Sequence, residues 1–438
     1  MSKFLHTGWL VFPLRVAPGH LRFIPRGQPT SPSLPSLLSM RLGSQWVKKV
    51  RIDSSGTSTP LQMKWPAQLR KNKNGQVQAG PFIAILTSAG EGGFRGNVSN
   101  FSDLIRTGRR MGVTVYVLTP EGLRPGAKTV KGFLLNPHSK GPRWVATTLP
   151  LPDVVYNRIP SRRHEMRPAE QKALAILSTM PGIHLFNPAF FNKWTLFLHM
   201  GRSEKLSRLL PDTVEWEGGT RLDEMVKKHS TLFLKPVNGK AGNGMIRISQ
   251  QERGYEIIHQ TLRGKQRFHS SDDKLRSKLK ALTRNRKYIL QQGIQLARYR
   301  GRPFDLRLLL QKKGTGQWDV TGIGVRVAGG GAISTHVPMG GSIAPIGEVL
   351  RSLFGNQAST ITEHLQSTAL EIASHIEKEE GKNLGEMSMD LGLEPDGKIW
   401  FFEANAKPMK FDEPVIRQKS LRRLIEYSLY LSGYARRS

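Results

Sequence analysis

Residues 234–248 read LKPVNGKAGNGMIRI, a segment in which two apolar-rich runs flank a loop with three glycines. Lys235 lies near the end of the first run, and the glycines of the loop are Gly239, Gly242 and Gly244. Glycine lets backbone N–H groups approach phosphate oxygens closely, so such a loop can form an anion-binding nest. No Gly-Lys-Ser or Gly-Lys-Thr occurs in the chain, which excludes a Walker A motif. Because a strand follows the loop, the segment is predicted to be a hairpin that closes over phosphates.

The strand before this loop, TLFLKP, carries its lysine among apolar residues. Side chains alternate along a strand, so Phe233 and Lys235 are predicted on one face and Leu232 and Leu234 on the other. A lysine in such surroundings costs free energy unless something negative meets it. A strand-end lysine that reaches water is the ordinary alternative, and the adjacent glycine loop favours contact with phosphate.

A second pair of strands carries carboxylates. Residues 384–393 (LGEMSMDLGL) and 399–405 (IWFFEAN) flank EPDGK, a tight turn, and are predicted to form an antiparallel hairpin. Asp390 then lies on the strand next to Glu403 and Asn405. The predicted faces of the second strand are Ile399, Phe401, Glu403 and Asn405 against Trp400, Phe402 and Ala404.

Two carboxylates and an amide on one sheet face are hard oxygen ligands of the kind that Mg²⁺ prefers, completed by nucleotide phosphates. The alternative is a solvated polar sheet face. It is disfavoured for Glu403, which sits between Phe402 and Ala404 in an apolar strand. The sequence therefore predicts a metal site formed by Asp390, Glu403 and Asn405.

Further polar side chains lie on other predicted strands. Arg307 in DLRLLLQK faces inward with Asp305, and Arg326 lies in GIGVRVA. Each arginine can donate two hydrogen bonds to a phosphate or a substrate, or it can form an ion pair with a neighbouring acid. Both alternatives stay open. A strand ending in Gln291 and Gln292 offers amides to an adenine edge, which is a weak signal by itself.

The composition limits the class of protein. The 438 residues predict two or three domains, and the absence of cysteine excludes disulfides and thiolate chemistry. No apolar run reaches the roughly 20 residues that a membrane span needs. The start, MSKFLHTGWLVFPL, lacks a clear cleavage site, so a cytoplasmic protein is expected. A formal charge of +33 attracts polyanions, but aromatic residues, at 8%, do not cluster with the basic runs, so nucleic-acid binding is disfavoured.

Differences in amino-acid composition and pattern divide the chain into three regions. Residues 1–80 contain twelve Lys or Arg and one acid, Asp53; within them, 27–44 resembles a linker and a small β module is predicted around 46–65. Residues 81–187 begin as strand, helix, strand, which predicts a βαβ unit and a parallel sheet. Residues 188–438 alternate helices and strands, including a helix over 361–380 that ends at Gly381 and buries Leu365, Ala369, Ile372 and Ile376.

One polar cluster follows a strand in the middle region and stays open between two interpretations, a substrate-binding loop and a solvated domain junction. Its members are Tyr156, Asn157, Arg158, Arg162 and Arg163.

The order of these motifs resembles the YheC/YheD family of endospore coat-associated proteins, within the ATP-grasp superfamily. The motifs that carry the resemblance are YNRIPSR, FNKW, LKPVNGKAGNGM, QQGI, FDLRLLLQK and FFEANAKP, and it extends over roughly 81–435. It implies an α/β (α+β) ATP-grasp fold over 188–438, in two subdomains, a preceding βαβ domain over 81–187, and a basic N-terminal extension over 1–80.

The resemblance also implies roles for individual residues. Lys193 and Lys235 would touch ATP phosphates, and Gln291 and Gln292 would lie near the adenine. Arg307 would contact the transferred phosphate or the substrate, so that Arg307 and Lys235 are the implied catalytic residues. The lid over the β- and γ-phosphates would consist of Asn238, Gly239, Lys240, Gly242 and Gly244, and the Mg²⁺ ligands would be Asp390, Glu403 and Asn405. His336 stands where related sequences often have asparagine.

The function implied is that of an ATP- and Mg²⁺-dependent carboxylate–amine ligase acting through an acylphosphate, associated with the spore coat. Its carboxylate and amine substrates are not visible in the sequence. Two alternatives remain open: a non-catalytic coat protein that retains the fold and associates with coat proteins or anionic surfaces, and, less favoured, a nucleic-acid-binding protein.

Overall fold

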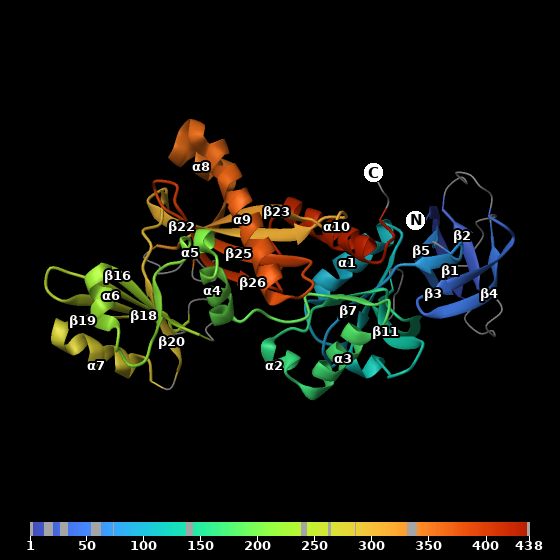
Figure 1. The fold of residues 1–438 in the computed structure, drawn as a ribbon, viewed down its shortest axis with the longest axis horizontal. Coiled ribbons are helices and arrows are strands. Elements are labelled where there is room, and N and C mark those ends of the chain that lie inside the picture. Colours follow the sequence, from blue (N-terminus) through green and yellow to red (C-terminus); the bar gives the residue numbers. More distant parts are fainter. Residues whose placement is uncertain are drawn as a thin grey trace.

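The computed structural model describes residues 3–12, 21–26, 34–53, 63–72, 74–136, 143–237, 243–261, 264–284, 286–330 and 340–435. Figure 1 shows an elongated molecule with a β-barrel at one end, a sheet with helices beside it, and two further sheets toward the other end. No helix in these residues is both long enough and apolar enough to cross a membrane.

The N-terminal strands close into a barrel with the order β1-β2-β4-β3-β6-β5. Their alternate side chains fill the interior, among them the fully buried Leu10, Phe23, Met40 and Leu69. The barrel is larger than the small module predicted around 46–65, and the predicted linker over 27–44 contains the strand β3. The strands are β1 (Lys3–Phe12), β2 (Arg22–Pro25), β3 (Leu37–Leu42), β4 (Gln45–Ile52), β5 (Met63–Lys71) and β6 (Val77–Gly80).

The second sheet has the order β12-β11-β10-β7-β13-β14, and β10, β7, β13 and β14 are parallel. The predicted strand–helix–strand unit is β7, α1 and β10. Helices α1 and α10 pack on one face, whereas α3 and the barrel pack on the other. The elements are β7 (Phe82–Leu86), β8 (Ala89–Gly90), β9 (Gly93–Phe94), α1 (Val98–Arg110), β10 (Thr114–Leu118), η1 (Pro120–Gly122), β11 (Thr129–Leu135), β12 (Trp144–Pro150), β13 (Val154–Asn157), α2 (Arg162–Glu165), α3 (Pro168–Thr179) and β14 (His184–Phe186).

The third sheet has the order β15-β20-β16-β17-β18-β19. As predicted, β16 and β17, which flank the glycine loop, pair antiparallel, and Leu232 and Leu234 enter the core on the face opposite to Lys235. Helices α4 (Lys193–Gly201) and α5 (Glu204–Ser207) precede this sheet in the chain and pack in the core of the fourth sheet. The elements of the third sheet and its own helices are β15 (Thr213–Glu215), α6 (Leu222–Lys228), β16 (Thr231–Pro236), β17 (Ile246–Gln250), β18 (Tyr255–Thr261), β19 (Gly264–Ser270), α7 (Asp272–Leu282) and β20 (Tyr288–Gln292).

The fourth sheet has the order β24-β23-β22-β25-β26, with β21 paired to β22. Helix α9 packs on one face through Leu365, Ala369, Ile372 and Ile376, as its spacing predicted, and it ends at Gly381 with a φ of 61°. The elements are β21 (Arg298–Tyr299), β22 (Arg302–Lys312), β23 (Trp318–Val327), β24 (Ser342–Pro345), α8 (Ile346–Phe354), η3 (Gly355–Gln357), α9 (Ala358–Glu380), β25 (Glu386–Leu393), β26 (Ile399–Asn405) and α10 (Pro414–Leu431).

Candidate functional site

The face of the fourth sheet opposite α9 collects the acids predicted as metal ligands. Asp390 on β25 lies directly opposite Glu403 on β26, and Ser388 lies opposite Asn405. On the other side of β25, Arg307 of β22 lies opposite Asp390. The register of three strands therefore brings Arg307 next to Asp390, Glu403 and Asn405, which the sequence analysis had grouped on one hairpin.

A β-bulge shapes this face. The register of β25 against β26 shifts between Asp390 and Leu391, so that Leu391 pairs with Phe401 and Asp390 with Glu403, leaving Phe402 as the extra residue. The strict alternation predicted for β26 was therefore wrong. Ile399, Phe401 and Ala404 all belong to the core beneath α9. The bulge lets Glu403 and Asn405 leave that core.

Asp390 is 2% exposed and sits among arginines. The Arg326 guanidinium donates to Asp390 Oδ2 at 2.8 Å and forks onto both oxygens of Asp305 at 2.7 and 2.6 Å. Burial raises the pKa of Asp390 to about 6, although Arg326 and Arg307 oppose that rise. Of the two alternatives left open for Arg326, the structure shows an ion pair with neighbouring acids.

One oxygen of this carboxylate is available to a further ligand. Asp390 Oδ1 is buried and accepts no hydrogen bond from the described residues, and the Arg307 guanidinium lies 3.9 Å from it. A buried carboxylate oxygen without a donor is costly, and a cation would satisfy it. Arg307 also donates to Ser388 Oγ at 3.3 Å while its side chain stays 25% exposed, so one face of it remains accessible.

Glu403 is held from two sides. Lys193, the first residue of α4, lies 2.5 Å from Glu403 Oε2, and the Asn405 amide donates to Oε1 at 3.3 Å. In the described part of the chain no three His, Asp or Glu side chains gather as a metal site by themselves. A cation here would rest on two carboxylates and the Asn405 oxygen, and its remaining ligands would come from a bound molecule. The donor set fits Mg²⁺ in that form.

Across from these acids, the third sheet presents Lys235. Its ammonium donates to Gln291 Oε1 at 2.5 Å and lies 5.4 Å from the centre of the Phe402 ring, which belongs to β26 of the fourth sheet. Lys235 is therefore a neighbour of the acid face. Burial lowers the pKa of Lys235 to about 8; Glu403 opposes this shift, and the positive charge of Lys193 adds to it.

The two glutamines differ in what they contact. Gln291 is buried, and its amide joins Lys235 to the Thr213 hydroxyl, which accepts from Nε2 at 2.8 Å. Gln292 Oε1 instead accepts a hydrogen bond from the Asp212 backbone N–H at 3.1 Å. This bond helps to hold β15 against β20.

The glycine loop is described at its end. Gly244 has a φ of +81°, which favours glycine, and its carbonyl accepts from the Tyr288 hydroxyl at 3.0 Å. The predicted lid residues Asn238, Gly239, Lys240 and Gly242, as well as His336, lie outside the described residues.

The cluster after β13 is a buried junction for part of its length. Tyr156 donates to the Glu386 carboxylate, Asn157 is fully buried, and Arg158 donates to the Pro408 carbonyl at 2.9 Å. These contacts join the second sheet to the fourth, so a solvated junction was the wrong alternative at these positions. Arg162 and Arg163 remain exposed.

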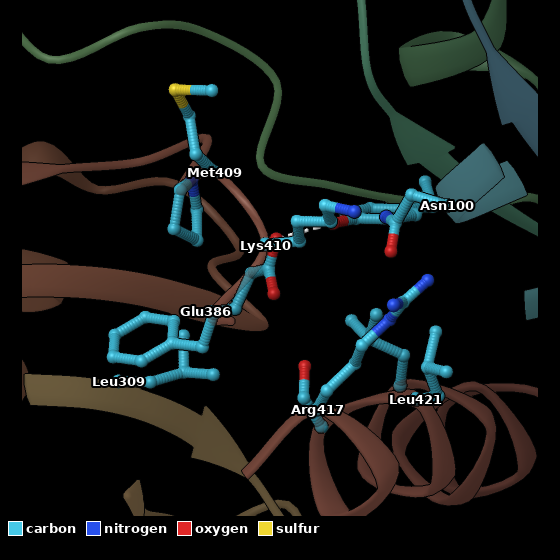
Figure 2. Close-up of a pocket in the computed structure, with 12 residues that line it drawn as sticks. Asn100, Leu309, Glu386, Met409, Lys410, Arg417 and Leu421 are labelled. Carbon is cyan, nitrogen blue, oxygen red and sulfur yellow. Dashed lines mark hydrogen bonds between the residues drawn. The ribbon is translucent and has the colours of Figure 1, made fainter. Parts of the chain in front are cut away.

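A small pocket of about 20 Å³, roughly the space of one water molecule, lies between the fourth sheet and α10. Figure 2 shows Leu309 and Glu386 from β22 and β25 on one side, with Arg417 and Leu421 of α10 across from them. Phe411 also lines it and lies 6.0 Å from the Arg307 guanidinium. The sequence analysis missed this pocket, because its walls come from distant segments that carry no shared motif.

Comparison with known proteins places these features in a family. The family described as YheC/D-like ATP-grasp matches residues 182–431, more than half of the chain. Endospore coat-associated protein YheD of Bacillus subtilis (strain 168) is 28% identical over 373 residues, 82% of this chain and 80% of that protein. Endospore coat-associated protein YheC of the same organism is 20% identical over 308 residues, 70% of this chain and 84% of that protein.

Among solved structures, D-alanyl-alanine synthetase A from Vibrio cholerae O1 biovar eltor strain N16961 is similar with a TM-score of 0.47 and 12% identity. That similarity covers 81% of this chain and 98% of the other. By the family match, which spans the third and fourth sheets and the whole acid face, this chain belongs to the YheC/D-like ATP-grasp family.

Proposed function

We propose that the protein binds ATP and Mg²⁺ between the third and fourth sheets and uses them as a carboxylate–amine ligase. One observation carries this proposal. Lys235 touches the Phe402 ring beside a buried acid face on which Asp390 Oδ1 accepts no hydrogen bond from the described residues. A cation for phosphate and an oxygen for metal thus lie in one place, as a metal–nucleotide complex requires.

In this proposal the metal ligands are Asp390, Glu403 and Asn405. Bound Mg²⁺ would neutralise charge on the phosphates that it bridges. Lys193, now paired with Glu403, lies close enough to exchange that carboxylate for a phosphate oxygen. Lys235 contributes a second cation, and Gln291 positions its ammonium through the hydrogen bond to Oε1.

Lid closure and adenine contact complete the nucleotide site. We assign the lid to Asn238, Gly239, Lys240, Gly242 and Gly244, whose backbone N–H groups would face the β- and γ-phosphates. The adenine would lie against β20 beside Gln291, whereas the oxygen of the neighbouring Gln292 is occupied by the Asp212 backbone N–H.

The acceptor would lie against the exposed part of the Arg307 side chain, with its carboxylate toward the guanidinium. A substrate carboxylate oxygen attacks the γ-phosphorus of ATP, and ADP leaves. The amine nitrogen would then attack the acyl carbon, and the C–O bond to phosphate would break as the amide forms, with the departing inorganic phosphate taking up the amine proton. Arg307 is placed to hold the carboxylate and the transferred phosphoryl group, because a guanidinium forks onto either.

The names of YheD and YheC support association with the endospore coat, after synthesis in the cytoplasm. The formal charge of +33 favours anionic surfaces or acidic coat components as partners there.

Thermal unfolding with ATP, with and without Mg²⁺, tests nucleotide binding. We expect ATP to raise the unfolding temperature only when Mg²⁺ is present, and Glu403→Gln to remove the dependence on Mg²⁺. Glu204→Gln, which changes an exposed carboxylate paired with Arg208, is the matched control and leaves the dependence intact. A Glu403→Gln protein that keeps every Mg²⁺-dependent effect contradicts the metal assignment.

ADP release over a panel of amino acids and peptides tests turnover. We expect release with at least one carboxylate and amine combination, and loss of it in Arg307→Ala. Mg²⁺-dependent ATP binding without ADP release from any combination would favour the non-catalytic coat protein over the ligase.

A further inference from the structure

The barrel contacts the rest of the molecule through β5, through β1 and at the β3–β4 turn. Thr114 of β10 donates to the Pro66 carbonyl at 2.7 Å, and Gln68 donates to the Met111 carbonyl at 3.2 Å. Arg70 lies over the Tyr434 ring at 4.0 Å. Pro66, Gln68 and Arg70 all belong to β5. In the closed order β1-β2-β4-β3-β6-β5, the strand three places from β5 is β4. The turn before β4 meets the body, where Gly43 lies against Leu151, and beyond that turn β4 lies on the far side of the barrel (Figure 1).

The outward surface of β4 and β3 is basic and carries one exposed indole, so the sequence analysis was wrong that aromatic residues are absent from the basic runs here. We call it the β4 face and define it by Trp46, Lys48, Lys49 and Arg51 of β4 with Leu37 of β3. Trp46 is 50% exposed and Leu37 is 55% exposed. The three cationic side chains are exposed as well. A single exposed apolar residue is ordinary, whereas an exposed indole beside three cations is a specific combination.

A β-bulge produces the two adjacent lysines. Leu38 pairs with Val50 and Met40 with Val47, so that Lys48 and Lys49 together lie opposite Ser39. Lys49 has a φ of 56°, in the region that side chains other than glycine rarely adopt. Regular alternation would turn one of two successive lysines inward, and the bulge turns both to the surface.

The charge of this region is not balanced by acids. Residues 1–80 contain twelve Lys or Arg and the single acid Asp53. Asp53 accepts a hydrogen bond from Arg22 at 3.1 Å on β2. The β4 face therefore keeps its positive charge, which suits a polyanion.

We propose that the β4 face binds single-stranded nucleic acid, independently of the ATP site. Trp46 offers a flat ring on which a base can stack, and Lys48, Lys49 and Arg51 offer cations to the backbone phosphates. The six residues from Trp46 to Arg51 extend about 16 Å along the strand, which suits a short run of nucleotides. An anionic polymer without bases would use the cations and leave the indole unused.

Fluorescence anisotropy of the full chain with short labelled single-stranded DNA and RNA tests the proposal. We expect Lys48→Glu/Lys49→Glu/Arg51→Glu to weaken binding at least ~10-fold and to reduce the slope of log K against log salt by about 2. The matched control is Arg124→Glu/Lys128→Glu/Lys172→Glu, which reverses the same residue types at exposed positions elsewhere and changes net charge equally. Binding by this control stays within about twofold of the unmodified chain.

Trp46→Ala separates base stacking from charge. We expect it to weaken binding by about tenfold and Trp46→Phe to restore most of the affinity, because stacking contributes ~1–3 kcal/mol per base. Lys235→Ala leaves nucleic-acid binding unchanged, which distinguishes this site from the ATP site.

Three results would overturn the proposal. Equal weakening by the two triple variants would show a diffuse effect of net charge. No effect of Trp46→Ala, with equal binding of inorganic polyphosphate, would show a polyanion site without base recognition. Absence of binding at physiological salt would leave the β4 face without this ligand. Unchanged thermal unfolding of the Trp46 variants ensures that none of these results reflects misfolding.

Discussion

The two sheets that meet at the candidate nucleotide site hold their charges in different ways. On the fourth sheet, Arg326 pairs with both Asp305 and Asp390, so these buried charges have partners within the protein before any ligand binds. On the third sheet, Lys235 donates to the neutral Gln291 amide, and burial depresses its pKa to about 8. The first arrangement stabilises a fold, whereas the second leaves a cation whose charge is better satisfied by an arriving anion.

This difference in charge pairing distinguishes residues that stabilise the fold around the site from residues that are available to bind a ligand. Asp390 belongs to both groups. Its Oδ2 accepts a hydrogen bond from Arg326, whereas its Oδ1 accepts none from the described residues and is available to a ligand. Removing Arg326 should therefore affect the fold more than the ligand, and removing Lys235 the reverse. Four experiments test this contrast between the two sheets, in order from the largest expected effect to the smallest.

Arg326→Ala leaves Asp305 and Asp390 buried without their shared cation. Removing one partner of a buried ion pair costs about 3–5 kcal/mol, so we expect a correspondingly lower free energy of unfolding in urea. Arg202→Ala removes a guanidinium that is 64% exposed and should leave the urea midpoint unchanged. Equal stability of Arg326→Ala and the unmodified chain would contradict the supporting role of the triad.

Lys235→Ala removes the cation from the third sheet. A hydrogen bond to a charged group contributes ~1.5–3 kcal/mol, so we expect Mg²⁺–ATP affinity to fall about 10- to 100-fold with little change in stability. Lys131→Ala, at an exposed position on β11, is the control and keeps full affinity. Isothermal titration calorimetry measures both, and a loss of stability without a loss of affinity would reverse the contrast between the two sheets.

The pKa of Lys235 predicts how ATP affinity depends on pH. In the free protein this ammonium loses its proton as pH rises through about 8, whereas a bound phosphate would hold the proton. Affinity is therefore expected to be flat just below pH 8 and to fall above it, by up to about tenfold per pH unit. Lys235→Arg stays charged throughout and should abolish the fall. The same alkaline fall in Lys235→Arg would assign it to another group.

Gln291→Ala and Gln292→Ala give the smallest effects. Gln291 positions Lys235, so its loss should weaken ATP binding several-fold, within the ~1 kcal/mol of a neutral hydrogen bond. Gln292 Oε1 serves the Asp212 backbone instead, and Gln292→Ala should change affinity less. Affinities in the opposite order would mean that Gln292 contacts the nucleotide and that Gln291 is a structural residue.

Local pattern was sufficient for elements whose partners are near in sequence. The EPDGK turn predicted the β25–β26 hairpin, and apolar spacing predicted the buried side of α9. The alternation of TLFLKP placed Lys235 opposite Leu232 and Leu234. In each case the periodicity of one segment, or a turn between two, carries the information.

The remaining features depend on pairing between segments that are far apart in the sequence, and the sequence analysis did not predict them. Barrel closure depends on parallel pairing of β2 with β4 and of β3 with β6, across intervening segments. The bulge at Phe402 overturned the predicted faces of β26, because one extra residue inverts the alternation. The double pairing of Arg326 likewise depends on the register of three strands. Such features arise where strands meet, and no single strand encodes them.

A crystal structure with a non-hydrolysable ATP analogue and Mg²⁺ tests the account most directly. We predict an ion ~2.0–2.1 Å from oxygens of Asp390 and Glu403, bridging to phosphates that Lys235 also contacts. A nucleotide bound elsewhere, or one bound between the sheets with its ion remote from both carboxylates, would contradict it.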